Sequence, residues 1–431
     1  MSKNVPVGYK LTEVGVIPED WDVCKLGSCL LTPPDYGINA PAVIFSDRLP
    51  TYIRITDITE EGRFSPDPPV SVNQTNSSNY YLKEGDLVFA RTGASVGKSY
   101  LYDIKDGELV FAGFLIRVHP DSKKLIPDYL SAYLTTGTYW NWIRLMSMRS
   151  GQPGINGNEY SQLPIPLPQI SEQRSIALVL SDTDALITSL DKLIAKKRDI
   201  KQAAMQQLLT GKQRLEGCDD SSGKFKQTEI GLIPEDWEVM SLCDLTTDIG
   251  DGIHSTPQYA KLSKFYFING NNLLNGKISI TDNTMCVSED EYLRLKKRLN
   301  NQTILLSING TIGNLAFFND EDIVLGKSAA YIIINPLINK NYVFYSLMTI
   351  ATSRYFESEL TGTTIRNLSL ATLRNTPISL PKYMEEQQAI AKVLSDMDSE
   401  ISALEQRRDK TKAIKQAMMQ ELLTGKTRLK S

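Results

Sequence analysis

The glycine-rich run GASVGKS at residues 93–99 is the segment whose composition first suggests chemistry, because it is similar to a phosphate-binding loop. A P-loop has four residues between its glycines, so that successive N–H groups surround the phosphates of a nucleotide. Here three residues separate the glycines, and the matching run at 310–314, GTIGN, has no lysine. The spacing therefore favours a tight turn between strands over the alternative, a nucleotide hydrolase site.

Other catalytic patterns are weaker still. The run PPDY at 33–36 has the wrong order for an amino-methyltransferase tetrad, in which Asn or Asp precedes the prolines. The chain has only two histidines, His119 and His254, and no Ser-His-Asp set, H-E-x-x-H motif or paired catalytic carboxylates stand out. Its five cysteines form no C-x-x-C pair, which argues against a zinc site and fits a reducing cytosol. We expect neither a metal nor a cofactor, and a cytoplasmic protein.

Polar loops offer a different chemistry, the reading of DNA bases. The loop GDGIHSTPQY at 250–259 falls at the position that DYGINA occupies at 35–40 in the first half. Asn, Gln, Ser, Thr, His and Arg side chains on such loops can contact base edges, and Lys98 could contact a phosphate. The alternative is an ordinary solvent-exposed loop, and the net charge of −3 counts mildly against DNA binding. The candidate DNA-contacting residues are Tyr36, Gly37, Asn39, Arg54, Arg91, Thr92, Lys98, Arg149, Gln152, His254, Ser255, Thr256, Asn269, Asn271, Asn272, Lys277, Asn309, Thr311, Thr363 and Arg366.

The elements that position these loops are revealed by a duplication. Residues 172–215 recur without a gap as residues 386–429, and TEVGVIPEDW at 12–21 recurs as TEIGLIPEDW at 228–237. A repeat unit of this length is too long for a solenoid and indicates two globular domains, each followed by the same helix. The matching polar loops differ in sequence, which suits two domains that bind different versions of one kind of target.

Each duplicated segment predicts one long helix. Apolar residues alternate steps of four and three from Ile176 to Ile194, as in a coiled-coil seam. Ser171 is the expected cap, and Gly211 and Gly425 are the expected stops. Such a helix is about 58 Å long and needs a partner for its apolar face, most simply its own copy. The sequence leaves parallel pairing open, but the short polar linker at 216–223 makes antiparallel pairing the easier route.

The globular parts are predicted to be mixed α/β, with candidate strands at 51–55, 86–90, 115–118, 265–268, 304–308 and 330–334. The later half of each long helix carries seven Lys or Arg residues. These form either a solvated face or a contact with a partner or a phosphate. The expected boundaries are a first domain at 1–170, a helix at 171–215, a linker at 216–223, a second domain at 224–383 and a second helix at 384–431.

Several of these motifs together resemble the specificity subunit of type I restriction–modification enzymes. The resemblance rests on the duplicated T-E-x-G-x-I-P-E-D-W opening, on LPIPLP at 163–168 and PISLP at 377–381, on the duplicated Glu-Gln pairs at 172 and 386, and on both L-L-T-G-K helix ends. It covers nearly the whole chain.

The resemblance implies that each globular half is a target recognition domain for one part of a split DNA sequence. It implies an antiparallel helix pair that acts as a spacer, with a pseudo-twofold relation between the halves. It also implies a non-catalytic subunit that binds double-stranded DNA, docks two modification subunits with adenine methyltransferase activity, and joins restriction subunits in an ATP-dependent nuclease. The alternatives are the nucleotide hydrolase considered above and a coiled-coil adaptor that binds only proteins.

Overall fold

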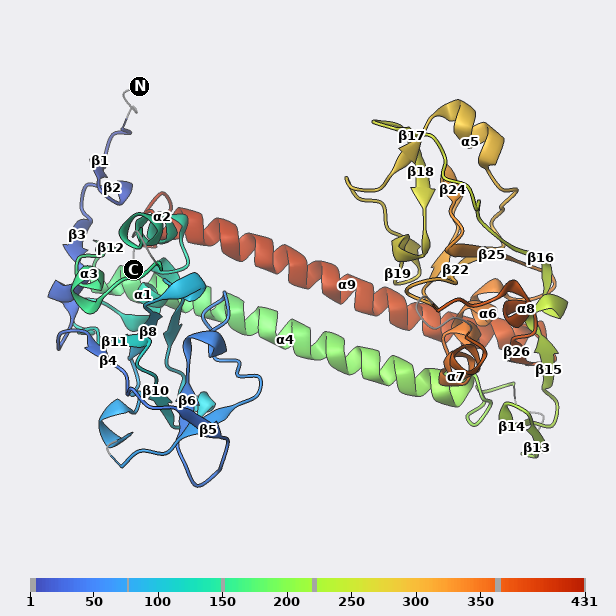
Figure 1. The fold of residues 1–431 in the computed structure, drawn as a ribbon, viewed down its shortest axis with the longest axis horizontal. Coiled ribbons are helices and arrows are strands. Elements are labelled where there is room, and N and C mark those ends of the chain that lie inside the picture. The colour runs from blue at the N-terminus through green and yellow to red at the C-terminus, as the bar shows by residue number, and fades with distance from the viewer. Residues whose placement is uncertain (1–4, 76, 149–151, 219–222, 361–365, 430–431) are drawn as a thin grey trace. The chain divides into compact units, whose positions relative to one another are not determined.

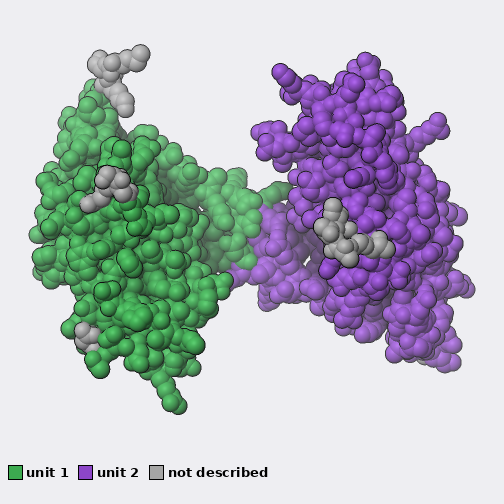
Figure 2. Space-filling model, in the orientation of Figure 1, with its two compact units in different colours: residues 1–191, 406–431 green, residues 192–405 purple. Residues whose placement is uncertain are grey.

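The structure is a computed structural model that describes residues 5–75, 77–148, 152–218, 223–360 and 366–429. The chain folds into two compact units, which Figure 2 shows in different colours. Unit 1 contains residues 1–191 and 406–431, and unit 2 contains residues 192–405. The division cuts both long helices, so each unit contains one globular part and half of each helix.

Unit 1 is mixed α/β and contains two four-stranded sheets. The first sheet is antiparallel and has the order β4 (Asp35–Tyr36), β11 (Leu115–Val118), β8 (Leu87–Ala90), β9 (Ser99–Leu101). The second has the order β10 (Leu109–Phe111), β6 (Thr51–Ile53), β7 (Val70–Val72), β5 (Ala42–Ile44), with β10 parallel to β6. The remaining elements are β1 (Tyr9–Thr12), β2 (Gly15–Pro18), β3 (Asp22–Lys25), β12 (Pro164–Leu167), α1 (Pro127–Tyr133), α2 (Gly137–Met146) and α3 (Gly157–Tyr160).

Unit 2 repeats this plan. Its antiparallel sheet has the order β16 (Thr246–Asp251), β25 (Ala329–Ile334), β22 (Thr303–Ser307), β23 (Leu315–Phe317). The second sheet has the order β17 (Tyr259–Ala260), β21 (Cys286–Val287), β18 (Phe265–Ile268), β24 (Ile323–Leu325), with β18 parallel to β24. The remaining elements are β13 (Phe225–Thr228), β14 (Gly231–Pro234), β15 (Glu238–Ser241), β19 (Leu273–Leu274), β20 (Lys277–Ile278), β26 (Pro377–Leu380), α5 (Glu289–Leu295), α6 (Lys340–Leu347), α7 (Ile350–Glu359) and α8 (Leu370–Arg374).

The sequence explains the central strands and the short helices. All four residues of β8 and all five of β22 are buried, as expected for strands covered on both faces. Thr136 and Thr349 cap α2 and α7, because each hydroxyl accepts a hydrogen bond from a first-turn N–H. The strands predicted at 115–118 and 265–268 have the predicted bounds, and the other four candidates differ by at most two residues at either end.

The two duplicated segments form the helices α4 (Ile170–Leu208) and α9 (Met384–Leu422), which are uninterrupted in Figure 1. The predicted seam is confirmed by burial, since Ile176, Leu180, Ile187, Leu190 and Ile194 are all less than 9% exposed. Both stops are confirmed, because Gly211 and Gly425 have positive φ angles of 65° and 68°. The predicted cap is wrong. The N–H of Gln173 donates to the carbonyl of Gln169, which places Ser171 inside the first turn.

Inside each unit, ion pairs join the two helices. In unit 1, Asp184 pairs with Lys415 at 2.7 Å and Asp191 with Arg408 at 3.5 Å. In unit 2, Lys201 pairs with Asp398 at 2.6 Å and Lys197 with Glu400 at 2.7 Å. Residue numbers rise along one helix as they fall along the other, so the helix halves run antiparallel within each unit. No helix in the described ranges combines the length and apolar character that crossing a membrane requires.

Candidate functional site

The polar loops of the two units are built on the same backbone frame. In unit 1, the N–H of Ile38 donates to the carbonyl of Phe111, and in unit 2 the N–H of Ile253 donates to that of Leu325, at 3.0 and 2.8 Å. Ile38 also forms a parallel β-bridge with Ala112, and Ile253 forms one with Gly326, the residue after each acceptor. The structure therefore confirms that the loop at 250–259 begins at the position that residues 35–40 occupy in the first half.

The glycines before these residues have a packing role. A Cβ atom on Gly37 would lie 2.3 Å from the carbonyl oxygen of Phe111, and one on Gly252 would lie 2.2 Å from that of Leu325. Only glycine permits this close approach of two backbones. The presence of glycine at position 37, a candidate DNA contact, is thus explained by the fold.

The residues that directly follow β8 and β22 also correspond. The N–H of Arg91 donates to the carbonyl of Phe114 at 3.1 Å, and the N–H of Ile308 donates to that of Ser328 at 2.9 Å. One residue later, Thr92 bridges Gly154 and Asn309 bridges Asn367. Shared backbone contacts thus define loop cluster 1 (residues 36–40, 54–57, 91–98, 112–114 and 152–156) and loop cluster 2 (residues 251–256, 269–272, 308–314, 326–328 and 366–368).

A short turn in each cluster has the same capping pattern with different side chains. In unit 1, the Asp57 carboxylate accepts hydrogen bonds from the Arg54 backbone and guanidinium, at 2.8 Å and 2.7 Å. The hydrogen bond to Asp57 raises the pKa of Arg54. In unit 2, the side-chain oxygen of Asn272 accepts the N–H of Asn269 at 3.0 Å. The turns at 54–57 and 269–272 therefore correspond in the two units.

Most cations in and beside cluster 1 are paired with carboxylates. Arg54 pairs with Asp57, Lys98 with Glu60 and Arg117 with Asp35, each at 2.7 Å. Lys98 lies between β8 and β9, where a P-loop would lead into a helix. The predicted tight turn between strands is confirmed, and the structure does not support a nucleotide hydrolase site there.

Arg91 differs from these cations. Its buried Nε has no hydrogen-bond partner among the described residues. The guanidinium lies over the Tyr36 ring, 5.0 Å from its centre, and the Tyr36 hydroxyl accepts the N–H of Gly157 at 3.0 Å. Gln152 is close by, with its Nε2 3.0 Å from the position of a Cβ on Gly93. Cluster 1 therefore places Tyr36 against the Arg91 guanidinium, with Gln152 beside Gly93 in the same cluster.

Cluster 2 is richer in neutral polar groups. The Ser328 hydroxyl donates to the side-chain oxygen of Asn269 at 2.9 Å and accepts the N–H of Gly270 at 2.9 Å. His254 Nε2 lies 2.8 Å from Asp251 Oδ2, and the imidazole is 72% exposed. Such side chains can both donate to and accept from base edges.

The candidate DNA-contacting residues differ in the exposure of their side chains. The exposed ones are Tyr36, Asn39, Gln152, His254, Ser255, Thr256, Asn271, Lys277, Thr311 and Arg366. The half-buried ones are Gly37, Arg54, Arg91, Thr92, Lys98, Asn269, Asn272 and Asn309. Arg149 and Thr363 lie outside the described residues. Phe114 and Ser328 also lie in the two clusters, although neither was a candidate, because a single phenylalanine or serine gives no signal of its own in the sequence.

In each unit, a buried Trp–Glu–Arg cluster joins three segments that are distant in sequence. In unit 1, the Arg428 guanidinium donates to Glu172 at 2.7 and 2.8 Å and to Asp20 at the same two distances. The indole N–H of Trp21 donates to the same glutamate at 3.1 Å. These hydrogen bonds, first those that Glu172 accepts and then those that Asp20 accepts, raise the pKa of Arg428.

The cluster of unit 2 has the same composition. Arg214 donates to Glu386 at 2.5 and 2.7 Å and to Asp236 at 3.0 Å, and Trp237 donates to Glu386 at 3.2 Å. Arg214 and Arg428 belong to the basic stretches for which a partner or phosphate contact was one expectation. Both instead neutralise a buried glutamate, so these two cations have a structural role.

Glu386 gives a pH dependence that can be tested. Burial raises the pKa of this carboxyl above its usual value, although the hydrogen bond from Arg214 opposes the shift. The folded protein thus keeps a proton that the unfolded chain has lost. Unit 2 should therefore lose stability as the pH rises from the unfolded pKa through the folded pKa of Glu386.

We expect the melting temperature of the wild type, relative to that of Glu386→Gln, to fall between pH 4 and pH 7, because glutamine keeps the shape and cannot titrate. The check is thermal unfolding of both proteins across that range. A difference that instead grows with pH would mean that the attraction of Arg214 outweighs the cost of burial.

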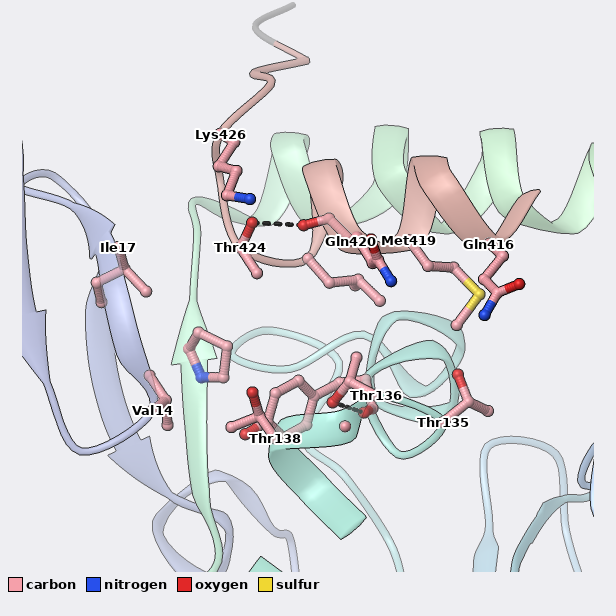
Figure 3. A pocket seen from close by; sticks show the side chains of 14 residues that line it. Val14, Ile17, Thr135, Thr136, Thr138, Gln416, Met419, Gln420, Thr424 and Lys426 are labelled. Carbon is pink, nitrogen blue, oxygen red and sulfur yellow. Dashed lines mark hydrogen bonds between the residues drawn. The ribbon is translucent and has the colours of Figure 1, made fainter. Parts of the chain in front are cut away.

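A hollow of about 380 Å³ in unit 1 contains no obvious reactive group. Figure 3 shows Thr135, Thr136 and Thr138 on one side and Gln416, Met419 and Gln420 of α9 on the other. No carboxylate, imidazole or thiol is among its lining residues. In the described part of the chain, no three His, Cys, Asp or Glu side chains gather as a metal site requires.

Comparison with known proteins is consistent across sequence and fold. Residues 48–199 and 234–415 match the family model described as the type I restriction modification DNA specificity domain. Two similar curated relatives are a putative type I restriction enzyme MjaX specificity subunit and the MjaVIII specificity subunit, both of Methanocaldococcus jannaschii. They are 29% and 28% identical, over 98% and 96% of this chain and 97% and 95% of theirs.

Solved structures show a similar fold. One is the type I restriction–modification S subunit of M. genitalium, with a TM-score of 0.58 and 14% identity over 93% of this chain and 96% of that one. Another chain belongs to a structure described as the basis of complex assembly and conformational transition of the type I R-M system. Its TM-score is 0.52, with 17% identity over 95% of this chain and 99% of that chain.

Proposed function

The chain belongs to the family of type I restriction modification DNA specificity proteins, and from that membership we propose that it reads a double-stranded DNA target in two parts, one with each unit. The observation that carries the proposal is the shared frame of loop clusters 1 and 2. The same backbone hydrogen bonds hold both, while the side chains at matching positions differ. Such an arrangement suits two readers that dock on DNA in the same way and contact different bases.

The candidate contacts come from these clusters and from Lys277 on β20. Loops on a rigid sheet can place polar side chains in a DNA groove, where they discriminate between base pairs. The net charge of −3 shows that the chain as a whole is not basic, so part of the phosphate contact would come from partner subunits.

The helices α4 and α9 would act as the spacer between the two readers. Antiparallel ion pairs inside each unit support a single helix pair with a pseudo-twofold relation between the target recognition domains. A rigid pair of this kind would fix the number of base pairs that separate the two parts of the target.

The chain would also be the scaffold of a larger enzyme. Its curated relatives carry the name of specificity subunits of type I restriction enzymes. By analogy, this chain would dock two modification subunits that methylate adenine, and through them restriction subunits that translocate DNA with ATP. The catalytic chemistry would belong to those partners, and this chain would supply the choice of sequence.

The test is a map of methylated adenines in a host that expresses this chain with its modification partner. We expect methylation at one target made of two short sequences with an unread gap of constant length. Methylation of a single uninterrupted sequence would overturn the two-part proposal. Stoichiometric ATP binding by the chain alone would favour a nucleotide hydrolase. If the chain and its modification partner together did not bind DNA, a protein adaptor would be favoured.

A further inference from the structure

Phe114 is an exposed aromatic residue inside loop cluster 1. It lies in the loop between β10 and β11, and its side chain is 57% exposed. The loop is held on both sides, because the N–H of Gly113 donates to the carbonyl of Ile38 and the carbonyl of Phe114 accepts the N–H of Arg91. A single exposed aromatic is common on protein surfaces, so its meaning depends on its neighbours.

Those neighbours contain a donor whose hydrogen-bonding capacity is unused. The Nε of Arg91 is buried without an acceptor in the described part of the chain, while Tyr36 supports the guanidinium face. Because that atom is buried, an incoming acceptor would meet the rest of the half-buried guanidinium, which forms no ion pair within the described residues. The nearby cations on Arg54, Lys98 and Arg117 are already paired with carboxylates. An acceptor that arrives at cluster 1 would therefore find Arg91.

The matching positions of unit 2 have different chemistry. The shared backbone hydrogen bonds place Ser328 at the position of Phe114 and Ile308 at the position of Arg91. The Ser328 hydroxyl is already bonded to Asn269 and Gly270. Unit 2 thus has neither the aromatic surface nor the arginine at these positions, and the difference between the units is a difference in reading chemistry.

We propose that Phe114, Arg91 and Tyr36 form the base-reading element of unit 1, in which Arg91 donates to an acceptor on one base and Phe114 packs on the adjacent base. Arginine most often donates to guanine O6 and N7 in the major groove, and phenylalanine contacts the thymine methyl group. The class of ligand is therefore a guanine beside a thymine within one half of the target. The inference rests on the proposed function and adds the bases that unit 1 reads.

The experiment compares methylation maps of the full chain with its modification partner for the wild type, Phe114→Ser, Arg91→Ala and a control, Phe45→Ser. Phe114→Ser installs the residue that unit 2 has at this position. Phe45 is another exposed aromatic of unit 1, 42% exposed, and it lies outside cluster 1. Each complex is also titrated with a duplex that contains the wild-type target, at several salt concentrations.

We expect Phe114→Ser and Arg91→Ala to relax the requirement at adjacent positions of the same half-site and to leave the other half unchanged. Affinity for the original target should fall roughly tenfold to hundredfold in each case. Phe45→Ser should reproduce the wild-type map. Phe114 is exposed, so the melting temperature of Phe114→Ser should stay near that of the wild type.

Three results would overturn the inference while the two-part function stands. One is a Phe114→Ser map that matches the wild type or the Phe45→Ser control. Another is a Phe114→Ser map in which the change falls in a different half-site from the change that Arg91→Ala causes. The third is uniform weakening across sequences with a shallower salt dependence, which indicates phosphate contact. If the wild type itself shows no split target, the proposed function fails first.

Discussion

Replacing Arg428 with alanine is expected to destabilise unit 1 by about 3–5 kcal/mol, because the buried carboxylate of Glu172 then has no cation. Glu172 is 4% exposed and has two hydrogen bonds from Arg428 and one from Trp21. In the folded protein almost none of this side chain is accessible to water. Arg428→Lys should lose less stability, since lysine restores the charge without the two-pronged geometry.

The matched control uses the duplication of the chain. Arg214→Ala removes the equivalent cation from Glu386, so its effect should fall on unit 2. Hydrogen exchange measured by mass spectrometry would locate each effect. Arg428→Ala should increase exchange around Trp21 and the start of α4, and Arg214→Ala should do so around Trp237 and the start of α9. Two results would contradict the structural role of the buried clusters. One is faster exchange in unit 2 for Arg428→Ala and in unit 1 for Arg214→Ala. The other is a loss of less than about 1 kcal/mol in the free energy of unfolding for both variants, as at an exposed ion pair.

Lengthening both helices by one heptad is expected to change the target rather than abolish recognition. The change duplicates residues 188–194 of α4 together with residues 405–411 of α9, segments that contain the ion pair of Asp191 with Arg408. Seven residues add about 10.5 Å to a helix. At about 3.4 Å per base pair, the gap in the target should grow by about three base pairs.

The seam repeats every seven residues, so a heptad in both helices preserves the apolar contacts. A chain with the heptad in α4 alone is the control, and it should lose stability because the paired residues fall out of register. Maps of methylated adenines would measure the gap. A gap of unchanged length in the doubly extended chain would show that the helices do not set the spacing.

Much of the scaffold could be predicted, because the spacing of apolar residues and the duplicated segments are visible in the sequence itself. The four-and-three spacing from Ile176 onward identified the long helices, and glycine at 211 and 425 identified their ends. The start of α4 was misplaced at Ser171, because whether a serine caps a helix depends on backbone geometry before it. The matched loops at 35–40 and 250–255 could be paired because they follow the same repeated motif.

The candidate site was less predictable, because availability of a side chain depends on what lies beside it in space. Lys98 and Arg91 look equally suitable in the sequence, yet Lys98 pairs with Glu60, whereas Arg91 forms no ion pair with a carboxylate in the described part of the chain. Phe114 lies in the run FAGFLIRV at 111–118, which reads as core, and only its position in the turn exposes it. The Trp–Glu–Arg clusters unite residues up to 408 positions apart, although every member belongs to a visible repeat.

The most direct measurement exchanges residues 8–170 for the corresponding segment of a family member with another target and maps methylated adenines with the same modification partner. We expect one half of the target to change to that of the donor, while the other half and the gap stay the same. A map in which both halves change together, or in which neither does, would contradict the account that each unit reads its own part of the DNA.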